Sequence, residues 1–375
     1  MYQSAGSGYT LLMKIALVHD FLVRYGGAER VLKVLSEMYP EAPIYTLMFD
    51  RASMASYFAP ERIITSSMQK WARWPGRLYR FFFSKMPRAI EEFDFSGFDV
   101  VLSSSQSYAH GVLTPVATKH ISYCHSPTRY LWDYTHQYIS DHEYRGLKGF
   151  FVRKKIQQVR EWDYLASDRP DLYIANSANV QRRIAKYYGK ESDVIYPPVD
   201  VDRFEVSRES EDYFLIVSQL SPYKRVDLAV QLFNKLGKRL VIVGAGPQEA
   251  YLRGIAGPTV EILGMKSDEE VATYMKYCRA VIFPGEDDFG IVPVEAMACG
   301  KPVLALASGG ALETVVPGVT GELFREPTVD GLEAGLAKLL LNMTVYRPKR
   351  IREHAEKFSR SVFERKVKMF IRELS

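Results

Sequence analysis

The sequence predicts an α/β protein with two domains, each a doubly wound parallel sheet covered by helices. Short runs of β-branched and aliphatic residues alternate with helical patterns, as they do in βαβ units. The chain has 375 residues, of which 47% are hydrophobic and 25% charged, enough for two domains with large cores. The pair Pro197 and Pro198 interrupts the alternation and indicates a boundary near residue 200.

The first half is expected to contain strands and helices in alternation. Gly26 and Gly27 open a helix that runs through Met38, and Ser177 and Gly189 bound a later helix. The expected strands span residues 14–19, 99–104, 120–125 and 171–175.

The second half repeats the alternation more regularly. Helices are expected at 226–236, after the capping box of Ser267 and Glu270, and around Glu295 with Pro293 at the first helical position. The expected strands span residues 213–220, 239–244, 260–264, 280–284 and 302–307.

These elements divide the chain into four parts. Residues 1–12 show no period and are expected to form a poorly ordered extension. Residues 13–200 form the N-terminal domain and 201–358 the C-terminal domain, and a helix in 359–375 is free to pack back on the former. Because parallel sheets bind ligands beyond the carboxyl ends of their strands, two facing domains would create a cleft lined by loops.

The most informative loop follows the strand expected at 280–284. Backbone N–H groups at the start of the next helix carry partial positive charge and could hold a diphosphate. Asp287 could then accept hydrogen bonds from sugar hydroxyls, and Glu295 could bind the two ribose hydroxyls. The alternative is that Glu295 only complements the helix dipole and that the loop acids are solvated.

This stretch resembles the retaining GT-B glycosyltransferases of family 4, whose pattern is two acids separated by seven residues within a long run ending in E-A-M-A-C-G-x-P-V. The matching residues are Asp287, Phe289, Gly290, Glu295, Ala296, Met297, Ala298, Cys299, Gly300, Pro302 and Val303. One residue departs from the pattern, because the first acid is usually Glu and is Asp287 here. The resemblance implies the GT-B fold, two facing Rossmann-like domains, with donor contacts from this loop that include Ile291.

Three further loops of the C-terminal domain agree with the resemblance. The turn SPYKR carries Lys224 and Arg225, which could neutralise charge on a leaving diphosphate; a solvated turn is the alternative. Gln219 stands where the family has an Arg, so either Arg225 substitutes for it or the phosphate clamp is weaker. The resemblance also implies donor contacts from two glycine loops, which contain Gly244 and Gly246, and Gly309, Gly310 and Glu313.

The N-terminal domain offers a glycine loop and two strand ends. Gly26 and Gly27 correspond to the family's paired glycines, which contact donor phosphate and acceptor; a tight turn without ligand is the alternative. For the residue that touches the donor sugar, the sequence leaves a choice between Gln106 and His110, with His110 slightly preferred.

The motif YCHSPTRYLWDY follows the next expected strand. His125 and Arg129 within it are expected to orient the acceptor, although a histidine at a strand end is often structural.

Within the family, the combination of GGAERV, YCHSPTRYLWD and PYKRVD looks most like mannosyltransferases that use GDP-mannose in bacterial O-antigen or exopolysaccharide assembly. The resemblance implies a front-face displacement in which the leaving diphosphate accepts the proton of a saccharide or lipid-linked acceptor. The expected catalytic residues are Asp287, Glu295, Lys224 and His110. No cofactor or metal is expected, since Lys224, Arg225 and helix dipoles supply positive charge, and the D-x-D at 200–202 lies in the linker.

Two basic, aromatic segments suggest peripheral contact with an anionic membrane. Residues 62–90 contain seven Lys or Arg and no Asp or Glu, and RGLKGFFVRKK follows later. A core helix with solvated cations is the alternative. No apolar run is long enough to span a bilayer, and three scattered cysteines suit a reducing compartment, so a cytoplasmic location is expected. A net charge of +5 without a binding module argues against nucleic acid.

Two other functions remain open. One is a catalytically weak nucleotide-sugar-binding scaffold, which the departures at Gln219 and Asp287 suggest. The other is a nucleotide-sugar epimerase of the same fold, which would convert donor without an acceptor. A dehydrogenase is disfavoured, because no G-x-G-x-x-G follows the first expected strand.

Overall fold

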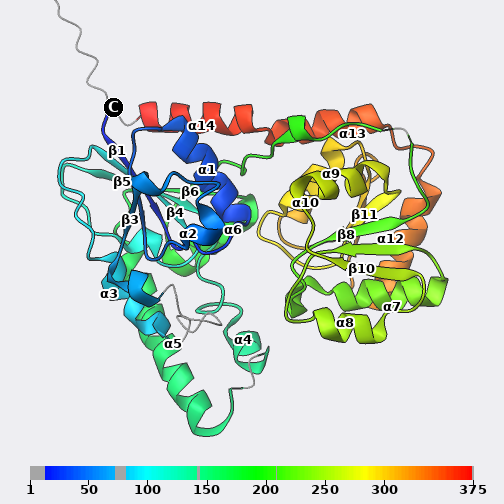
Figure 1. Cartoon of the computed structure of the whole chain (residues 1–375), viewed down its shortest axis with the longest axis horizontal. Helices are drawn as coiled ribbons and strands as arrows, with labels where there is room; N and C mark the ends of the chain where they lie inside the picture. Colours follow the sequence, from blue (N-terminus) through cyan, green and yellow to red (C-terminus); the bar gives the residue numbers. More distant parts are fainter. Residues whose placement is uncertain (1–12, 72–81, 142–143, 208, 374–375) are drawn as a thin grey trace, which may run out of the picture. The chain divides into compact units, whose positions relative to one another are not determined.

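The computed structural model describes residues 13–71, 82–141, 144–207 and 209–373. The chain forms two compact units. The first unit comprises Met1–Ile174 and Ile184–Ser192, and the second comprises Ala175–Arg183 and Asp193–Ser375. Each unit has its own sheet, with helices around it (Figure 1).

The seven-stranded sheet lies mostly in the first unit and has the strand order β3-β2-β1-β4-β5-β6-β7, with β7 contributed by residues of the second unit. The pairs β1–β2, β1–β4, β2–β3 and β4–β5 are all parallel. Its strands are β1 (Ile15–His19), β2 (Ile44–Thr46), β3 (Ile63–Thr65), β4 (Val100–Ser105), β5 (Lys119–Cys124), β6 (Leu172–Ala175) and the short β7 (Asp193–Val194). Strands β1 and β4 are buried along their whole length, because helices cover both faces of a parallel sheet.

The helices that begin in this half differ widely in length. They are α1 (Gly27–Met38), α2 (Arg51–Met54), α3 (Met86–Ile90), α4 (Thr135–Asp141), α5 (Gly146–Ala166) and α6 (Ala178–Tyr188), with 3-10 turns that include η4 (Ala109–Gly111). Helix α1 starts after Gly26 and buries Val31, Leu32 and Leu35 on one face, the spacing of an amphipathic helix.

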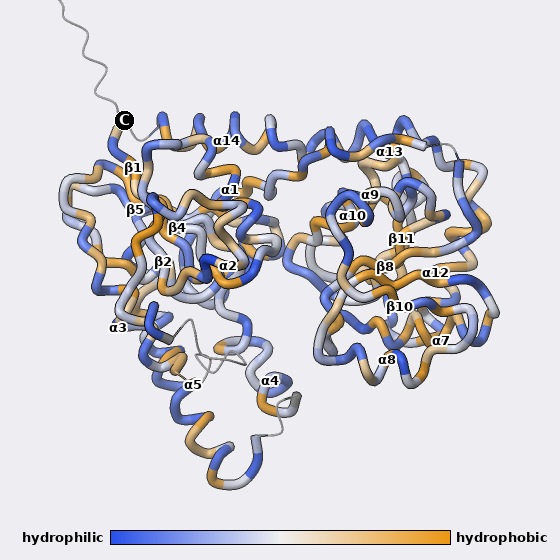
Figure 2. Tube along the Cα trace, viewed as in Figure 1, coloured by the Kyte–Doolittle hydropathy of each residue, from blue (hydrophilic) through white to orange (hydrophobic). Residues whose placement is uncertain are grey.

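The sheet of the second unit has the order β10-β9-β8-β11-β12-β13, and every pair is parallel. Its strands are β8 (Phe214–Val217), β9 (Leu240–Val243), β10 (Val260–Gly264), β11 (Ala280–Phe283), β12 (Val303–Leu306) and β13 (Gly321–Phe324). They are short apolar runs rather than alternating ones, since both faces are covered, and Figure 2 shows β8 and β11 as a hydrophobic centre.

Helices and turns separate these strands and continue to the C-terminus. They are η5 (Val201–Arg203), η6 (Pro222–Lys224), α7 (Val226–Leu236), α8 (Glu249–Ile255), α9 (Asp268–Tyr277), α10 (Ile291–Ala298), α11 (Ala311–Thr314), α12 (Val329–Leu341), α13 (Pro348–Ala355), η7 (Glu356–Phe358) and α14 (Arg360–Arg372). In α14, Phe363, Val367 and Ile371 are buried at helical spacing.

The expected elements are confirmed to within a few residues at their ends. The helix at 226–236 matches α7, and Ser267 and Glu270 form the capping box of α9. Ser177 accepts a hydrogen bond from the N–H of Val180 at the start of α6 (3.1 Å). Strands β2, β3, β7 and β13 were not predicted, because their short runs have no strong period. The helices α2–α5, α8 and α11–α13 were not predicted either.

One helix start was wrong. Helix α10 begins at Ile291, so Pro293 is its third residue and Glu295 lies beyond its first turn. Gly290 makes the early start possible, because it adopts φ 82° and turns the chain sharply into the helix. Pro293 fits there, since the first four N–H groups of a helix need no helical partner.

The described residues include neither a membrane-spanning helix nor a group of side chains that could bind a metal. None of their helices is both long and apolar enough to cross a membrane, and none of their His, Cys, Asp and Glu side chains gather in a group that could hold a metal ion. All three cysteines are buried, and none of them forms a disulfide. Residues 72–81 of the basic, aromatic segment lie outside the described residues, whereas Met86, Ala89 and Ile90 in α3 are buried.

Candidate functional site

Both sheets reverse their strand order at one point, and several of the predicted site residues follow the strands beside it. In the first unit the reversal lies between β1 and β4, and in the second between β8 and β11. Loops that leave such a pair of strands diverge to opposite faces, which leaves room for a ligand beyond the carboxyl ends.

Lys224 and Asp287 meet across the second reversal point. The turn η6 after β8 presents Lys224, and the loop after β11 presents Asp287; the Lys224 ammonium donates a hydrogen bond to Asp287 Oδ1. Only 11% of the Lys224 side chain and 27% of the Asp287 side chain are exposed. Gly285 permits this approach, because a Cβ there would lie 2.5 Å from Lys224 Cα. Sequence reasoning missed Gly285.

Arg225 and Gln219 flank this pair without joining it. Arg225 takes a left-handed conformation with φ 50°, the N-cap position of α7, and its Nε lies 3.5 Å from Asp227 Oδ1. Gln219 is exposed. A left-handed non-glycine residue is uncommon and strained, and such positions concentrate at functional sites.

The loop with Gly244 and Gly246 supports the turn that carries Lys224. A Cβ at Gly244 would lie 1.8 Å from Ser218 O, and one at Gly246 would lie 2.3 Å from Leu220 O. Two backbone hydrogen bonds join the loops, from Leu220 N to Ala245 O (3.1 Å) and from Gln248 N to Leu220 O (3.0 Å). These glycines therefore allow the loops after β8 and β9 to touch.

Gly309 and Gly310 hold the loop of Asp287 in the same way. Cβ atoms there would lie 2.1 Å from Asp287 O and 2.2 Å from Phe289 O, and Gly310 N donates to Asp287 O (2.9 Å). Phe289 is buried, and its ring packs against those of Tyr196 and Phe358, so it anchors the loop to the core.

Glu295 is buried and paired rather than placed beside Asp287. Arg203 Nη2 donates to Glu295 Oε1 (3.2 Å), and Arg203 Nη1 donates to Asp268 Oδ2 (2.7 Å). A buried carboxylate needs such a partner. Sequence reasoning missed Arg203, because the residue stands in the linker motif, 92 positions before Glu295.

Glu313, which the resemblance implies near the diphosphate, binds backbone N–H groups of α6. Its two carboxylate oxygens accept hydrogen bonds from Ala178 N (2.8 Å) and Asn179 N (2.9 Å), at the start of α6. Asp288 lies close by, where its backbone O accepts from Ser177 Oγ (2.7 Å) and its carboxylate lies 3.5 Å from Arg183 Nη1. Asp288 is thus engaged in contacts within the second unit.

In the first unit, four polar side chains form a hydrogen-bonded chain at the strand ends. His19 Nε2 lies 3.4 Å from Glu29 Oε1, and His19 Nδ1 lies 3.1 Å from Ser104 Oγ. Ser104 Oγ in turn lies 2.8 Å from His125 Nε2. This chain, Glu29–His19–Ser104–His125, connects the first turn of α1 to the end of β5 and fixes the ring of His125.

The surroundings of this hydrogen-bonded chain of side chains favour the neutral form of His125. Burial lowers the pKa of His125 to about 3, and the neighbouring His19 adds to the effect. Gly26, beside the same turn, could not carry a Cβ without contact, since it would lie 3.1 Å from Glu29 Oε2. The paired glycines lie at the start of α1, and the first turn of the same helix supplies Glu29.

His110 and Gln106 lie in contrasting environments. His110 is buried, with Nδ1 3.2 Å from Ser105 Oγ and Nε2 3.7 Å from Asp163 Oδ1, and burial lowers its pKa to about 4. Gln106 is exposed at the carboxyl end of β4. Arg129 is partly buried, and its guanidinium lies 5.8 Å from the ring centroid of Tyr134.

Asp20, which sequence reasoning missed, determines the shape of the Gln106 loop. Its buried carboxylate accepts hydrogen bonds from the backbone N–H groups of Gln106, Ser107, Tyr108 and Ala109, at 2.5 to 3.1 Å. Consecutive N–H groups that converge in this way form an anion-binding nest, which Asp20 fills itself. The sequence feature that could have indicated Asp20 is an acidic residue directly after the first expected strand.

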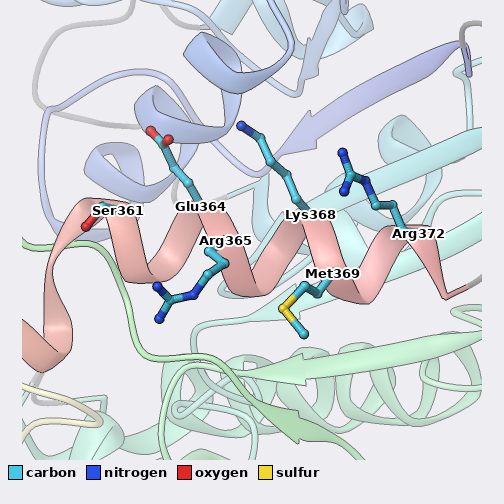
Figure 3. A pocket seen from close by; sticks show the side chains of 6 residues that line it. All are labelled: Ser361, Glu364, Arg365, Lys368, Met369 and Arg372. Carbon is cyan, nitrogen blue, oxygen red and sulfur yellow. The ribbon is translucent and has the colours of Figure 1, made fainter.

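A hollow of about 290 Å³ runs along one face of α14. Ser361, Glu364, Arg365, Lys368, Met369 and Arg372 line it (Figure 3). None of the predicted site residues belongs to it.

Two family descriptions match consecutive parts of the chain. Glycosyltransferase Family 4 matches residues 25–203, and Glycosyl transferases group 1 matches residues 200–358. The two matches together run from residue 25 to residue 358, so most of the chain is similar to glycosyltransferases of group 1 and family 4.

Solved structures show the fold. Sucrose-phosphate synthase of Thermosynechococcus elongatus superposes with a TM-score of 0.72 at 17% identity, over 96% of this chain and 99% of that one. HepE of Anabaena, in complex with UDP-glucose, gives 0.70 at 19% identity, over 96% and 100%. The chain therefore has the GT-B fold, which confirms the expected pair of Rossmann-like sheets.

Curated relatives match part of their length. An uncharacterised glycosyltransferase of Methanocaldococcus jannaschii is 27% identical over 198 residues, 52% of this chain and 53% of that protein. The D-inositol 3-phosphate glycosyltransferase of Mycobacterium tuberculosis is 29% identical over 197 residues, 45% of this chain and 39% of that protein. The match thus spans about half or less of these relatives.

Proposed function

We propose that the protein is a glycosyltransferase that moves a hexose from a nucleoside diphosphate donor to a saccharide or lipid-linked acceptor, with retention and without a metal. The observation that carries the proposal is the Lys224–Asp287 pair, held at the reversal point between β8 and β11 by glycine loops. A cation and a carboxylate kept close and mostly buried provide the two groups that a sugar diphosphate needs.

In the proposed reaction the donor diphosphate competes with Asp287 for the Lys224 ammonium. Asp287 is then released to accept hydrogen bonds from the sugar hydroxyls, and Lys224 stabilises the charge that grows on the leaving diphosphate. Arg225 supplies a second cation, and the leaving phosphate accepts the proton of the acceptor hydroxyl. The protein contributes mainly orientation and electrostatic stabilisation.

In the same proposal, one half of the chain binds the donor and the other half binds the acceptor. Residues 201–358 bind the donor through Gly244, Gly246, Gly309, Gly310 and Glu295, and residues 13–200 bind the acceptor through His125 and Arg129. We propose GDP-mannose as the donor. For the residue that contacts the donor sugar, we propose Gln106 rather than His110, because Gln106 is exposed and His110 is buried. We place the protein in the cytoplasm, at the inner face of the cell membrane.

A donor panel tests the binding step. Thermal unfolding would be followed with GDP-mannose, UDP-glucose and ADP-glucose, and the largest rise in Tm is expected with GDP-mannose. Glu295→Ala should abolish the rise, and Glu333→Ala, which loses a partly exposed carboxylate of α12, should preserve it. An equal rise with all three donors would reject the choice of base, and no rise with any donor would reject the site.

An assay with labelled donor and a lipid-linked saccharide extract tests transfer. Label in the saccharide product, with the same anomeric configuration as the donor, is the expected result. Tight donor binding without transfer or hydrolysis would favour a scaffold, and conversion of the donor without acceptor would favour an epimerase.

A further inference from the structure

Helix α5 carries a surface that the candidate site does not use. Gly149, Ile156 and Val159 are buried and define the face that packs on the first unit. Leu147 precedes Ile156 by nine residues, and at about 100° per residue the two point in opposite directions. The outward face of the first turns is therefore apolar, although it faces away from the core.

Three side chains form this outward face. Leu147 is 80% exposed, Phe150 62% and Phe151 59%. Figure 1 shows the Gly146 end of α5 as the part of the helix farthest from the sheet of its own unit, and Figure 2 shows hydrophobic and charged residues interleaved there. Apolar side chains with so much exposure, adjacent on one helix, mark an interaction surface.

Cations border these apolar side chains on both sides. By helical position Arg153 lies on one side, Lys148 and Lys155 lie on the other, and Lys154 follows the patch by one turn; all four are exposed. From Arg145 to Arg160 the sequence has six Lys or Arg and no Asp or Glu. We name Leu147, Phe150 and Phe151 with Lys148, Arg153, Lys154 and Lys155 the tip surface.

We propose that the tip surface docks on an anionic lipid bilayer. Leu147, Phe150 and Phe151 enter the boundary between headgroups and acyl chains, while the flanking cations lie on lipid phosphates. Lys and Arg stems are long enough to place their charges at the headgroups while the helix lies at the surface.

Charge decides between this occupant and a second copy of the chain. Two tip surfaces brought together would oppose four cations with four cations, and no acid lies between Arg145 and Arg160 to pair with them. An anionic bilayer instead provides opposite charge and an apolar layer in one surface. The proposal goes beyond the transfer reaction and does not depend on it.

Vesicle co-sedimentation of the full chain tests the proposal without donor or acceptor. Binding is expected on vesicles that contain phosphatidylglycerol, with little binding on pure phosphatidylcholine, and at least about a fivefold loss between roughly 0.05 M and 0.5 M salt.

A matched pair of variants locates the surface. Leu147→Asp should lower the bound fraction at least about fivefold. Leu341→Asp makes the same change at a leucine of α12 that is also 80% exposed, and should bind as the parent does. Circular dichroism and thermal unfolding without ligand check that both variants fold.

Three results would overturn the proposal. They are no binding of the parent to anionic vesicles, equal loss in the two leucine variants, and a concentration-dependent dimer that Leu147→Asp dissolves while vesicle binding persists. Loss of donor binding or of transfer activity, by contrast, would concern only the proposed function.

Discussion

Lys224 and Asp287 illustrate how single residues set the chemistry of this protein. Each is mostly buried, and each is the partner of the other in the absence of donor. Because the desolvation of an unpaired charge is costly, the pair keeps the site stable until phosphate and sugar hydroxyls replace the internal contacts.

Lys224→Ala is expected to lower kcat by at least about tenfold, which corresponds to about 1.4 kcal/mol of transition-state stabilisation. The reason is that the leaving diphosphate loses its nearest cation. Steady-state kinetics measure the effect. Lys235→Ala is the control, since it removes a lysine of α7 that pairs with Glu333 on the surface, and a comparable loss there would contradict a specific role of Lys224.

Ser104→Ala tests the hydrogen-bonded chain of the first unit. The serine joins His19 to His125, and its loss removes about 1 kcal/mol of positioning, so KM for the acceptor should rise about fivefold while KM for the donor changes little. Ser122→Ala, a buried serine of β5 whose hydroxyl has no partner among the described residues, is the control. A rise in donor KM instead would place His125 in another role.

At the scale of elements, close contacts between loops align the site. The loop after β9 touches the loop after β8, and the loop after β12 touches the loop after β11. Glycine is required at these contacts, because any side chain would overlap a backbone carbonyl. The geometry around Lys224 thus depends on residues that need not touch the donor.

Gly246→Ala should destabilise the protein by about 1–3 kcal/mol and weaken donor binding, since its Cβ would lie 2.3 Å from Leu220 O. Gly254→Ala is the matched change, in α8, where a Cβ meets nothing within 4 Å; it should be neutral or stabilise by up to about 1 kcal/mol. Urea unfolding and a donor titration measure both quantities. Equal stability of the two variants would refute the steric argument.

On the scale of the whole molecule, the buried histidines make stability depend on pH. Burial lowers the pKa of His110 to about 4 and those of His120 and His125 to about 3, from an ordinary value of 6.5. The unfolded chain therefore binds more protons than the folded one between about pH 4 and 6.5, and stability falls as pH falls through that range.

Asp163 acts in the opposite direction. Burial raises its pKa to about 7 from 3.8, so the folded state holds a proton that the unfolded state loses above about pH 4. Its contribution to stability is present below pH 4 and is lost as pH rises through 7. Between about pH 4 and 6.5, the three histidines take up about three protons on unfolding, and Asp163 releases about one. These four groups together therefore take up about two protons on unfolding.

Urea unfolding between pH 7 and pH 4.5 should show this slope as a steady fall in the free energy of unfolding, of order 2–3 kcal/mol per pH unit at its steepest. His120→Asn should make the fall shallower, because it removes one histidine whose pKa differs between the folded and the unfolded state. A free energy that stays level or rises on acidification would contradict the argument.

The sequence by itself determined the features that depend on neighbouring residues. The strand–helix alternation, the capping box of α9 and the acid motif around Asp287 are local patterns, so they predicted the two sheets and the loop that carries the candidate donor residues. The tertiary structure decided which charges meet. Lys224 pairs with Asp287 across 63 positions, Arg203 with Glu295 across 92, and Glu313 with α6 across 135. Such partners are chosen by the packing of strands far apart in the chain, which no local pattern records.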